Sequence, residues 1–466
     1  MSEQKPALPG RPRLAEHALV RRHFIDGQEI VVVHDTRSGD LVRMQPRAWA
    51  LIEAADGTRD LGGLLLAASQ RGELVRSSEV EAVLGGLHSM DLLTDGIDPF
   101  ALDPPAPVCD AATPLDVLPF SLVCDGSGSC CATYGTVRFT DDEAERARAL
   151  LPGASGGRAR TFLPLAGSGA QRAGAATMID GACAYLASDG ACELHRTHGA
   201  PSKPAGCSIY PASFVFDGDA VRVSLGVECA CIAKSLGRTG GVPLVPASAS
   251  VRADLPAGAQ IVPLPEAIDL RAGVTAPREA VVKWSRAVLR AHAASSPGAP
   301  ASDAAAIFWS LAVTVEAGDL SEEGARAAIE AAALPPEEAL APWTAALAER
   351  TAAKQESADR WRSERDRVRM ASRRLASAAA SLKERAPLAA ALAGESAPRP
   401  LEAFYLTAAL HGHALLGEIP LAHALRDRAI RLLLARAIPD FEHPLPLVEA
   451  MMRAQGVKEY ARDVPG

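Results

Sequence analysis

The chain has 466 residues, of which 48% are apolar and 22% are charged, which is typical of a folded protein of roughly two to four domains and excludes a disordered or collagen-like chain. Lys and Arg number 48 against 56 for Asp and Glu, and the resulting net charge of −8 makes nucleic-acid binding unlikely as a general function. Aromatic residues make up only 4%, which favours helices packed through small and aliphatic side chains over a large β-sandwich.

The sequence predicts neither export nor a membrane partner. The opening segment MSEQKPALPGRPRL has no apolar signal core. The longest nearly apolar stretch, residues 304–315, is too short to cross a bilayer. We therefore expect a cytoplasmic protein.

Residues 1–98 predict a small winged-helix-like domain. A buried strand over 30–33 and a second strand over 41–44 flank turn residues 37–40 and form a hairpin. Apolar residues at helical spacing then predict three helices. The first begins at Pro46, the second follows Asp60 as its N-cap, and the third covers 80–90. This order resembles the winged-helix chaperone of pyrroloquinoline-quinone biosynthesis and related peptide-recognition elements. The resemblance implies that a peptide binds as an added strand at a sheet edge.

The rest of the chain predicts two further domains joined by linkers. A Pro-rich linker over 99–119 precedes a cysteine-rich domain over 120–240, and a second linker follows over 241–275. From 276 to 466 we expect an α-helical bundle. Its apolar residues have helical spacing over 280–294, 304–315, 322–334, 343–382 and 401–437. The predicted fold class is α+β and helix-rich, with an irregular metal-binding domain in the middle.

All nine cysteines lie between Cys109 and Cys231. Three interpretations of this cluster are open. Disulfides fit poorly with the odd count and the missing export signal. A structural zinc site lacks the usual C-x2-C knuckles. An iron-sulfur or catalytic metal centre fits best, because thiolates are the preferred ligands of both iron-sulfur clusters and zinc.

Four segments carry a family resemblance: CDGSGSCC (124–131), CAYLASDGACELHRTHG (183–199), KPAGCSIYP (203–211) and VSLGVECACIAKSLG (223–237). In this order they resemble the YkgJ-type cysteine-cluster family of zinc- or iron-chelating domains, and most closely its flagellin lysine N-methylase branch. That branch has a further cysteine just before its paired cysteines, where this chain has residues 125–129. The resemblance implies these metal ligands: Cys124, Cys130, Cys131, Cys183, Cys192, Cys207 and Cys229. Cys231 matches less closely, and Cys109 lies outside the motifs.

The resemblance also implies N-methylation of a lysine in a protein or peptide, with S-adenosylmethionine as methyl donor. No donor site is visible in the sequence, because Gly167-Ser168-Gly169 continues without the third glycine of a nucleotide-binding loop. The radical-type C-x3-C-x2-C spacing is absent as well. The alternative is a non-enzymatic adaptor with a structural zinc site, and no catalytic residue is assigned.

Several other residues have two interpretations. His195 and His198 are spaced to share a helix face and complete a mixed Cys/His site, although exposed loop histidines are the simpler interpretation. Tyr185 and Tyr210 suit either a lysine pocket or core packing. The histidines of the C-terminal region are interpreted as helix-surface or core residues rather than a second metal site. They are His411, His413 and His423. An arginine-rich run over 360–374 is interpreted as a solvated helix face.

Overall fold

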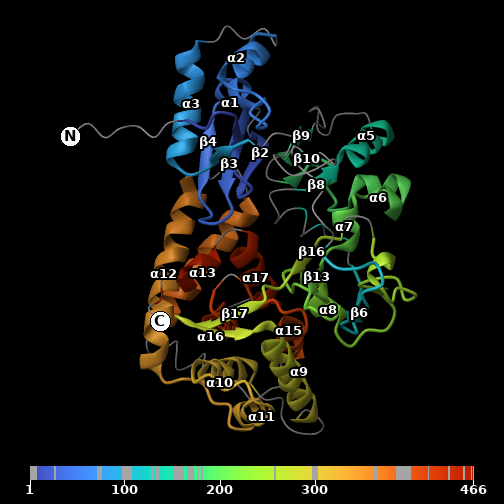
Figure 1. Cartoon of the computed structure of the whole chain (residues 1–466), viewed down its shortest axis with the longest axis vertical. Helices are drawn as coiled ribbons and strands as arrows, with labels where there is room; N and C mark the ends of the chain where they lie inside the picture. Colours follow the sequence, from blue (N-terminus) through green and yellow to red (C-terminus); the bar gives the residue numbers. More distant parts are fainter. Residues whose placement is uncertain are drawn as a thin grey trace, which may run out of the picture. The chain divides into compact units, whose positions relative to one another are not determined.

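The computed structural model shows a mixed fold of helices and strands, in agreement with the predicted α+β class (Figure 1). It describes all residues except 1–7, 26–27, 71–75, 97–107, 125, 127, 129–130, 132–136, 152–161, 165–172, 177, 180–181, 257–258, 296–302, 361–365, 385–399, 418, 439–440, 455–456, 463 and 465–466. The chain forms two compact units. Unit 1 comprises 1–106, 130–204 and 362–366, and unit 2 comprises 107–129, 205–361 and 367–466. The cysteine-rich segment 120–240 therefore contributes to both units.

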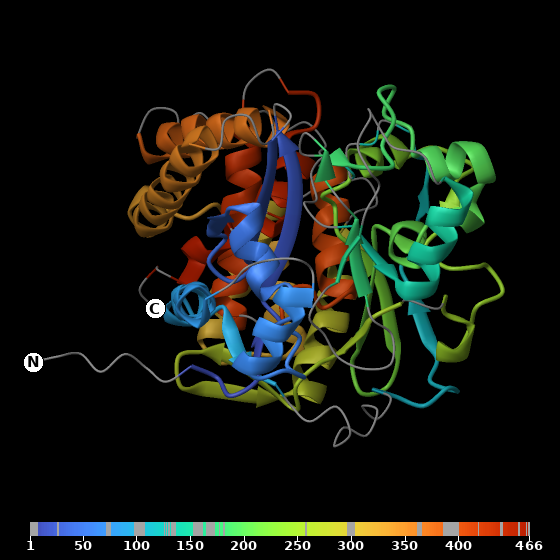
Figure 2. The ribbon, with the colours of Figure 1, turned by 90° about the horizontal axis from the view of Figure 1, so that it is seen from above.

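Unit 1 contains a five-stranded sheet in the order β12-β11-β2-β3-β4. The antiparallel strands β2 (Ala18–Ile25), β3 (Gln28–Asp35) and β4 (Leu41–Met44) belong to the N-terminal region and include the long blue strands of Figure 2. The cysteine-rich segment adds β11 (Met178–Ile179), parallel to β2, and β12 (Ala182–Cys183). Two regions that the sequence predicts as separate domains thus share one sheet.

Three helices follow the hairpin: α1 (Pro46–Ile52), α2 (Leu61–Gln70) and α3 (Ser77–Ser89). Pro46 occupies the first turn of α1, and Asp60 Oδ1 accepts a hydrogen bond from the Gly63 amide at 2.8 Å, so both predicted helix starts are confirmed. The buried side chains of β3 and α3 form one hydrophobic core with α1. Strand β1 (Pro12–Leu14), which precedes these elements in the sequence, pairs with β5 (Leu93–Asp95), which follows them.

The remaining part of unit 1 has a small sheet in the order β8-β10-β9, made of β8 (Arg138–Thr140), β10 (Ala173–Ala176) and β9 (Phe162–Pro164). Helix α5 (Asp141–Leu150) begins with a capping box between Thr140 and Glu143, in which Thr140 Oγ1 accepts from the Glu143 amide at 3.2 Å. Helix α6 (Glu193–His198) and the 3-10 turn η1 (Ala200–Ser202) complete the unit.

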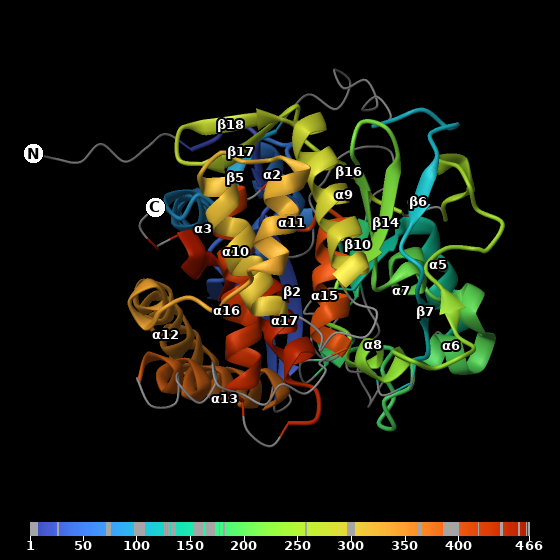
Figure 3. The same cartoon turned by 90° about the horizontal axis from the view of Figure 1, so that it is seen from below.

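Unit 2 is built around a four-stranded sheet in the order β16-β13-β14-β6. Strands β13 (Ala212–Phe216) and β14 (Val221–Leu225) form an antiparallel hairpin, with β6 (Leu115–Val117) beside β14 and β16 (Ile261–Pro263) beside β13 (Figure 3). Helices α7 (Ala205–Ile209) and α8 (Ala230–Ser235) flank the hairpin in the sequence.

The segment 241–275, predicted as a linker, contains strands and one 3-10 turn. They are β15 (Val242–Pro243), which pairs with β7 (Ser121–Leu122), η2 (Arg252–Asp254), β16, and the pair β17 (Ala267–Arg271) and β18 (Val274–Pro277). Ile268 and Leu270 of β17 are buried in the same core as the helices. This segment is therefore an integral part of unit 2.

Helices make up the rest of unit 2. They are α9 (Arg278–Ser295), α10 (Ala304–Glu316), α11 (Glu322–Glu330), α12 (Glu337–Arg360), α13 (Asp366–Lys383), α15 (Pro400–His411), α16 (Leu421–Arg436), α17 (Pro444–Ala454) and η3 (Val457–Arg462). The hairpin and the helices share one hydrophobic core, in which Val221 and Val223 of β14 are buried together with Trp284 of α9.

The segment 401–437, whose apolar residues have helical spacing, forms two helices. Helix α15 ends at His411 and α16 begins only at Leu421. The backbone between them has positive φ angles at His413 (50°) and Gly417 (104°), and Pro420 precedes α16. Positive φ angles do not continue an α-helix, and a proline cannot lie inside one without breaking it. The chain therefore turns between α15 and α16.

Candidate functional site

The segments that carry Cys207, Cys229 and Cys231 adjoin one end of the β13–β14 hairpin in unit 2. Cys207 lies on α7, which precedes β13, while Cys229 and Cys231 follow β14 at the start of α8. The strands are antiparallel, with Ala212 opposite Leu225, so the start of β13 and the end of β14 lie together. The Gly226 amide donates to the Pro211 carbonyl at 3.3 Å and closes this end.

Cys124 is connected to the same end of the hairpin. The amide of the preceding residue, Val123, donates to Ser235 Oγ of α8 at 2.9 Å, and Ser235 Oγ donates to the Cys231 carbonyl at 2.6 Å. Cys229 and Cys231 are buried, Cys207 is half-buried and Cys124 is exposed. The four cysteines thus extend from the core of unit 2 to its surface.

In unit 1, a turn brings the segments of Cys183 and Cys192 together. Cys183 ends β12, and its carbonyl accepts a hydrogen bond from the Leu186 amide at 2.8 Å. Leu186 forms a β-bridge with Cys192, which is the N-cap of α6. Cys131 is half-buried in the same unit. Cys130 lies outside the described residues.

The predicted ligands are therefore divided between the two units. The thiol chemistry fits zinc or iron, but within the part of the chain that the structure describes no group of three or more His, Cys, Asp and Glu side chains is arranged to hold a metal. His195 and His198 are exposed on α6, and His198 Nε2–H donates to the Leu150 carbonyl at 3.1 Å. Tyr185 is buried and its ring lies 5.8 Å from that of Phe139, so it packs in the core.

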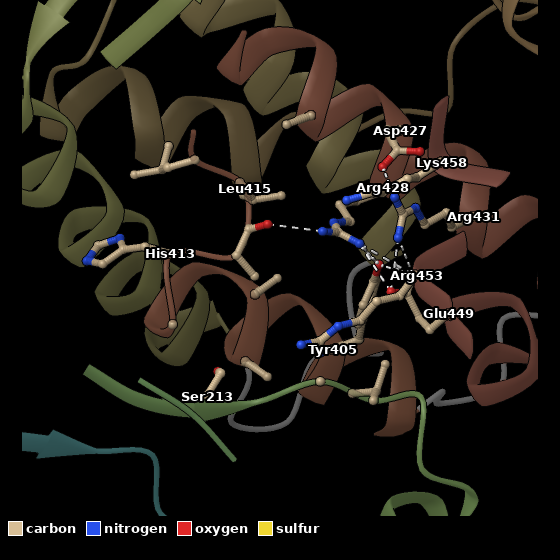
Figure 4. Close-up of a pocket in the computed structure, with 18 of the residues that line it drawn as sticks. Ser213, Tyr405, His413, Leu415, Asp427, Arg428, Arg431, Glu449, Arg453 and Lys458 are labelled. Carbon is tan, nitrogen blue, oxygen red and sulfur yellow. Dashed lines mark hydrogen bonds and ion pairs between the residues drawn. The ribbon is translucent and has the colours of Figure 1, made fainter. Parts of the chain in front are cut away.

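Unit 2 also contains a cavity of about 340 Å³ that sequence reasoning missed (Figure 4). Its walls come from the β13–β14 hairpin, α15 and the turn after it, α16, α17 and η3. One part is apolar and includes Leu225, Ala409 and Leu415. The other part is a group of charged side chains around Arg428 and Arg431.

This charged group is a buried network. Glu449 Oε1 accepts a hydrogen bond from Tyr405 Oη at 2.5 Å, and its Oε2 lies 3.0 Å from Arg431 Nη1 and 3.2 Å from Arg428 Nη1. Arg431 also pairs with Asp427, whose Oδ2 lies 2.5 Å from Arg431 Nη2. The four ionised side chains are between 4% and 14% exposed. Two cations and two anions thus compensate each other in a site with little water.

Burial and neighbouring charges together set the pKa values of Glu449 and Tyr405. Burial raises the pKa of Glu449, but the guanidinium groups of Arg431 and Arg428 outweigh it and hold that pKa below the ordinary value. Burial, joined by the nearby Glu449 carboxylate, raises the pKa of Tyr405 well above its ordinary value. The carboxylate therefore stays charged and the phenol stays protonated at neutral pH.

A second buried polar group connects α15 with the sheet of unit 2. His411 Nε2–H donates to the Asp116 carbonyl of β6 at 3.1 Å, and His413 Nε2 lies 3.7 Å from Asp217 Oδ2. Arg222 of β14 contacts the carboxylates of both Asp116 and Asp217. Burial raises the pKa of Asp217, but His413, the Ala220 amide and Arg222 outweigh it and the pKa is strongly lowered. These histidines therefore have structural partners.

One sequence signal points to the charged network. Asp427 and Arg431 are four residues apart in a helical segment whose other positions are largely aliphatic. Charges on an otherwise buried helix need partners inside the protein, and the i,i+4 spacing supplies one of them. The partners from other helices, Glu449 and Tyr405, have no such signal because they are distant in the sequence.

Comparison with family models, curated proteins and solved structures yields no match to this chain. The cysteine-cluster resemblance therefore stays a prediction from the motifs. Among the described helices, none combines the length and the apolar character that a membrane crossing needs.

Proposed function

We propose that the chain is a cysteine-cluster metalloprotein that binds zinc or an iron-sulfur cluster and modifies a protein or peptide substrate. The metal proposal rests on the family resemblance and on one observation, that the segments carrying Cys207, Cys229 and Cys231 adjoin one end of the β13–β14 hairpin, while the segment of Cys124 is bonded to α8. These segments are distant in the sequence. Four thiolates are a common ligand set for both zinc and iron-sulfur clusters.

The peptide part of the proposal rests on the edge strand of the sheet in unit 1. Among the described strands, β4 is the last on one side of this sheet, whereas β11 pairs with β2 on the other side. A terminal strand offers backbone groups to which an extended peptide can add. Lysine N-methylation with S-adenosylmethionine as donor is the reaction that the family resemblance favours. The alternative remains a metal-binding adaptor without catalysis.

The metal proposal is tested on the full chain purified without oxygen, by elemental analysis for iron and zinc, assay of acid-labile sulfide and an absorbance spectrum. The double variant Cys207→Ser/Cys229→Ser should lose the metal. Cys109→Ser is the matched control, because Cys109 is buried in the same unit and lies outside the motifs. Absence of metal from the wild type, or its full retention in the double variant, contradicts the proposal.

The metal's identity separates the two functions. Iron with sulfide supports a catalytic centre and leads to titration with S-adenosylmethionine and a methylation assay on lysine peptides. Zinc without saturable binding of S-adenosylmethionine favours the adaptor. A Leu41→Pro variant tests the peptide edge, because in the antiparallel register of β3 and β4 the Leu41 amide points away from β3, and it should weaken peptide binding without removing the metal.

A further inference from the structure

Two valines of the sheet in unit 2 form an apolar floor in the cavity. Val215 of β13 lies directly beside Val262 of β16 in the parallel register, and both side chains line the cavity. On the neighbouring strand β14, α15 covers the same face of the sheet, because Ser224 Oγ donates to the Ala408 carbonyl at 2.8 Å. Val262 is 59% exposed. The valine floor thus faces the cavity and is in part open to solvent.

The walls add further apolar surface. They come from the end of β14, from α15 and from the turn that follows it. Their apolar residues include Leu225, Val227, Ala409, Leu415, Leu416 and Ile419. The volume of about 340 Å³ lies at the small end of the range of ligand pockets. Floor and walls therefore suit the apolar body of a small molecule, since its burial removes apolar surface from water.

The charged side chains of the cavity compensate one another. Among the described lining residues, each of four carboxylates pairs with an arginine that also lines the cavity. The pairs are Asp427–Arg431, Glu449–Arg428, Glu228–Arg453 and Glu459–Arg462. Lys458 is not without a partner either, and His413 Nε2 lies 3.7 Å from Asp217 Oδ2. An ionised group that enters the cavity would have to separate existing partners or lose its water without compensation.

We propose that this cavity binds a small uncharged organic molecule, with its apolar body on the valine floor and against the leucines of the walls. A hydroxyl or carbonyl group on the ligand is compatible with the site, because Ser213 Oγ also lines the cavity and a hydroxyl can donate and accept. Ser213 lies apart from the charged group around Arg428 (Figure 4). The proposal does not depend on the metal or on the methylation reaction.

The test is calorimetric titration of the full chain with three compounds that share one body and differ in their polar group. They are 4-phenylbutan-1-ol, 4-phenylbutyrate and 4-phenylbutylamine. We expect saturable one-to-one binding of the alcohol, and binding of both ions that is weaker by at least about tenfold, because each ion must give up water without a new counter-charge. No binding of the alcohol, or equal or tighter binding of either ion, would overturn the proposal.

Variants locate the site. Val262→Trp takes up space in the cavity from an exposed position, and Leu416→Trp does so from a half-buried one, so each should weaken binding of the alcohol by at least about tenfold. Val242→Trp is the matched control, since Val242 is a strand residue of the same unit, is 72% exposed and does not line the cavity.

Thermal unfolding first establishes that each variant is folded. Weaker binding in either folded cavity variant, with unchanged affinity in Val242→Trp, supports the assignment. Unchanged affinity in both cavity variants, or an equal loss in the control, would contradict it.

Discussion

Arg431 on α16 and Glu449 on α17 form an ion pair in which Nη1 lies 3.0 Å from Oε2 and the two side chains are only 5% and 8% exposed. The pair joins two helices that are adjacent in the sequence and packed together in unit 2. In such a dry site each charge depends on its partner, because water cannot replace a lost contact.

We therefore expect Glu449→Ala to lower the free energy of unfolding by about 3–5 kcal/mol, since it leaves Arg431 and Arg428 buried with one carboxylate fewer. Equilibrium unfolding in urea measures the change. Glu316→Ala is the control, because Glu316 is 36% exposed in its pair with Arg426, and it should cost no more than about 1 kcal/mol. Equal effects of both variants would contradict the buried character of the network.

Gly412 permits the close approach of the end of α15 to β14. A Cβ atom at this position would lie 2.4 Å from Ser224 Cβ, whose hydroxyl donates to the Ala408 carbonyl at 2.8 Å. Gly412→Ala should therefore lower the free energy of unfolding by about 1–3 kcal/mol. A Cβ atom at Gly206 on α7 would have no atom within 4 Å. Gly206→Ala should therefore leave the free energy of unfolding unchanged or raise it by up to about 1 kcal/mol. Thermal or urea unfolding of the two variants distinguishes a packing effect from a general effect of alanine.

Two half-buried histidines predict a loss of stability on mild acidification. Burial is the main cause that lowers the pKa of His411, which faces Asp116, Arg222 and His413, and the pKa of His423, which faces Arg426 and Glu316. The unfolded chain then binds protons below about pH 6.5 that the folded chain does not bind. The free energy of unfolding should therefore fall between about pH 7.5 and about pH 5.5.

The lowered pKa of Asp217 does not contribute in that window, because its stabilising effect is lost only as the pH falls below the ordinary carboxyl value of about 4. The double variant His411→Gln/His423→Gln should reduce the loss between the two pH values. Urea titrations at both pH values measure the difference. Stability that rises on acidification, or a loss of the same size in the double variant, would be inconsistent with neutral buried imidazoles.

The paired cysteines provide a separate test of the metal ligands. Cys130→Ser with Cys131→Ser should reduce the bound metal measured by elemental analysis. The same variant should leave the sheet and helices of residues 18–95 folded, because the buried core described for that part is formed by residues between Leu14 and Leu93. Proteolysis followed by mass spectrometry reports whether this part stays protected. Retention of stoichiometric metal would rule out both residues as ligands.

Local patterns in the sequence were sufficient to predict many of the elements. The strands at 30–33 and 41–44 and the helix starts at Pro46 and after Asp60 are present, because turn residues, caps and apolar spacing act over a few residues. The helix over 304–315 is present as α10, whose N-cap Asp303 accepts a hydrogen bond from the Ala305 amide at 2.8 Å. Clustering of the cysteines is likewise a property of the sequence alone.

Tertiary structure decided what joins these elements. Three features depend on segments that meet only after folding. They are the pairing of β11 with β2, the turn of the chain between α15 and α16, and the network of Arg428, Arg431 and Glu449. A strand of two residues, such as β11, has no pattern of its own, because its hydrogen bonds come from a partner about 150 residues away. The cavity likewise exists only where helices and hairpin pack together, so the sequence alone gave no indication of it.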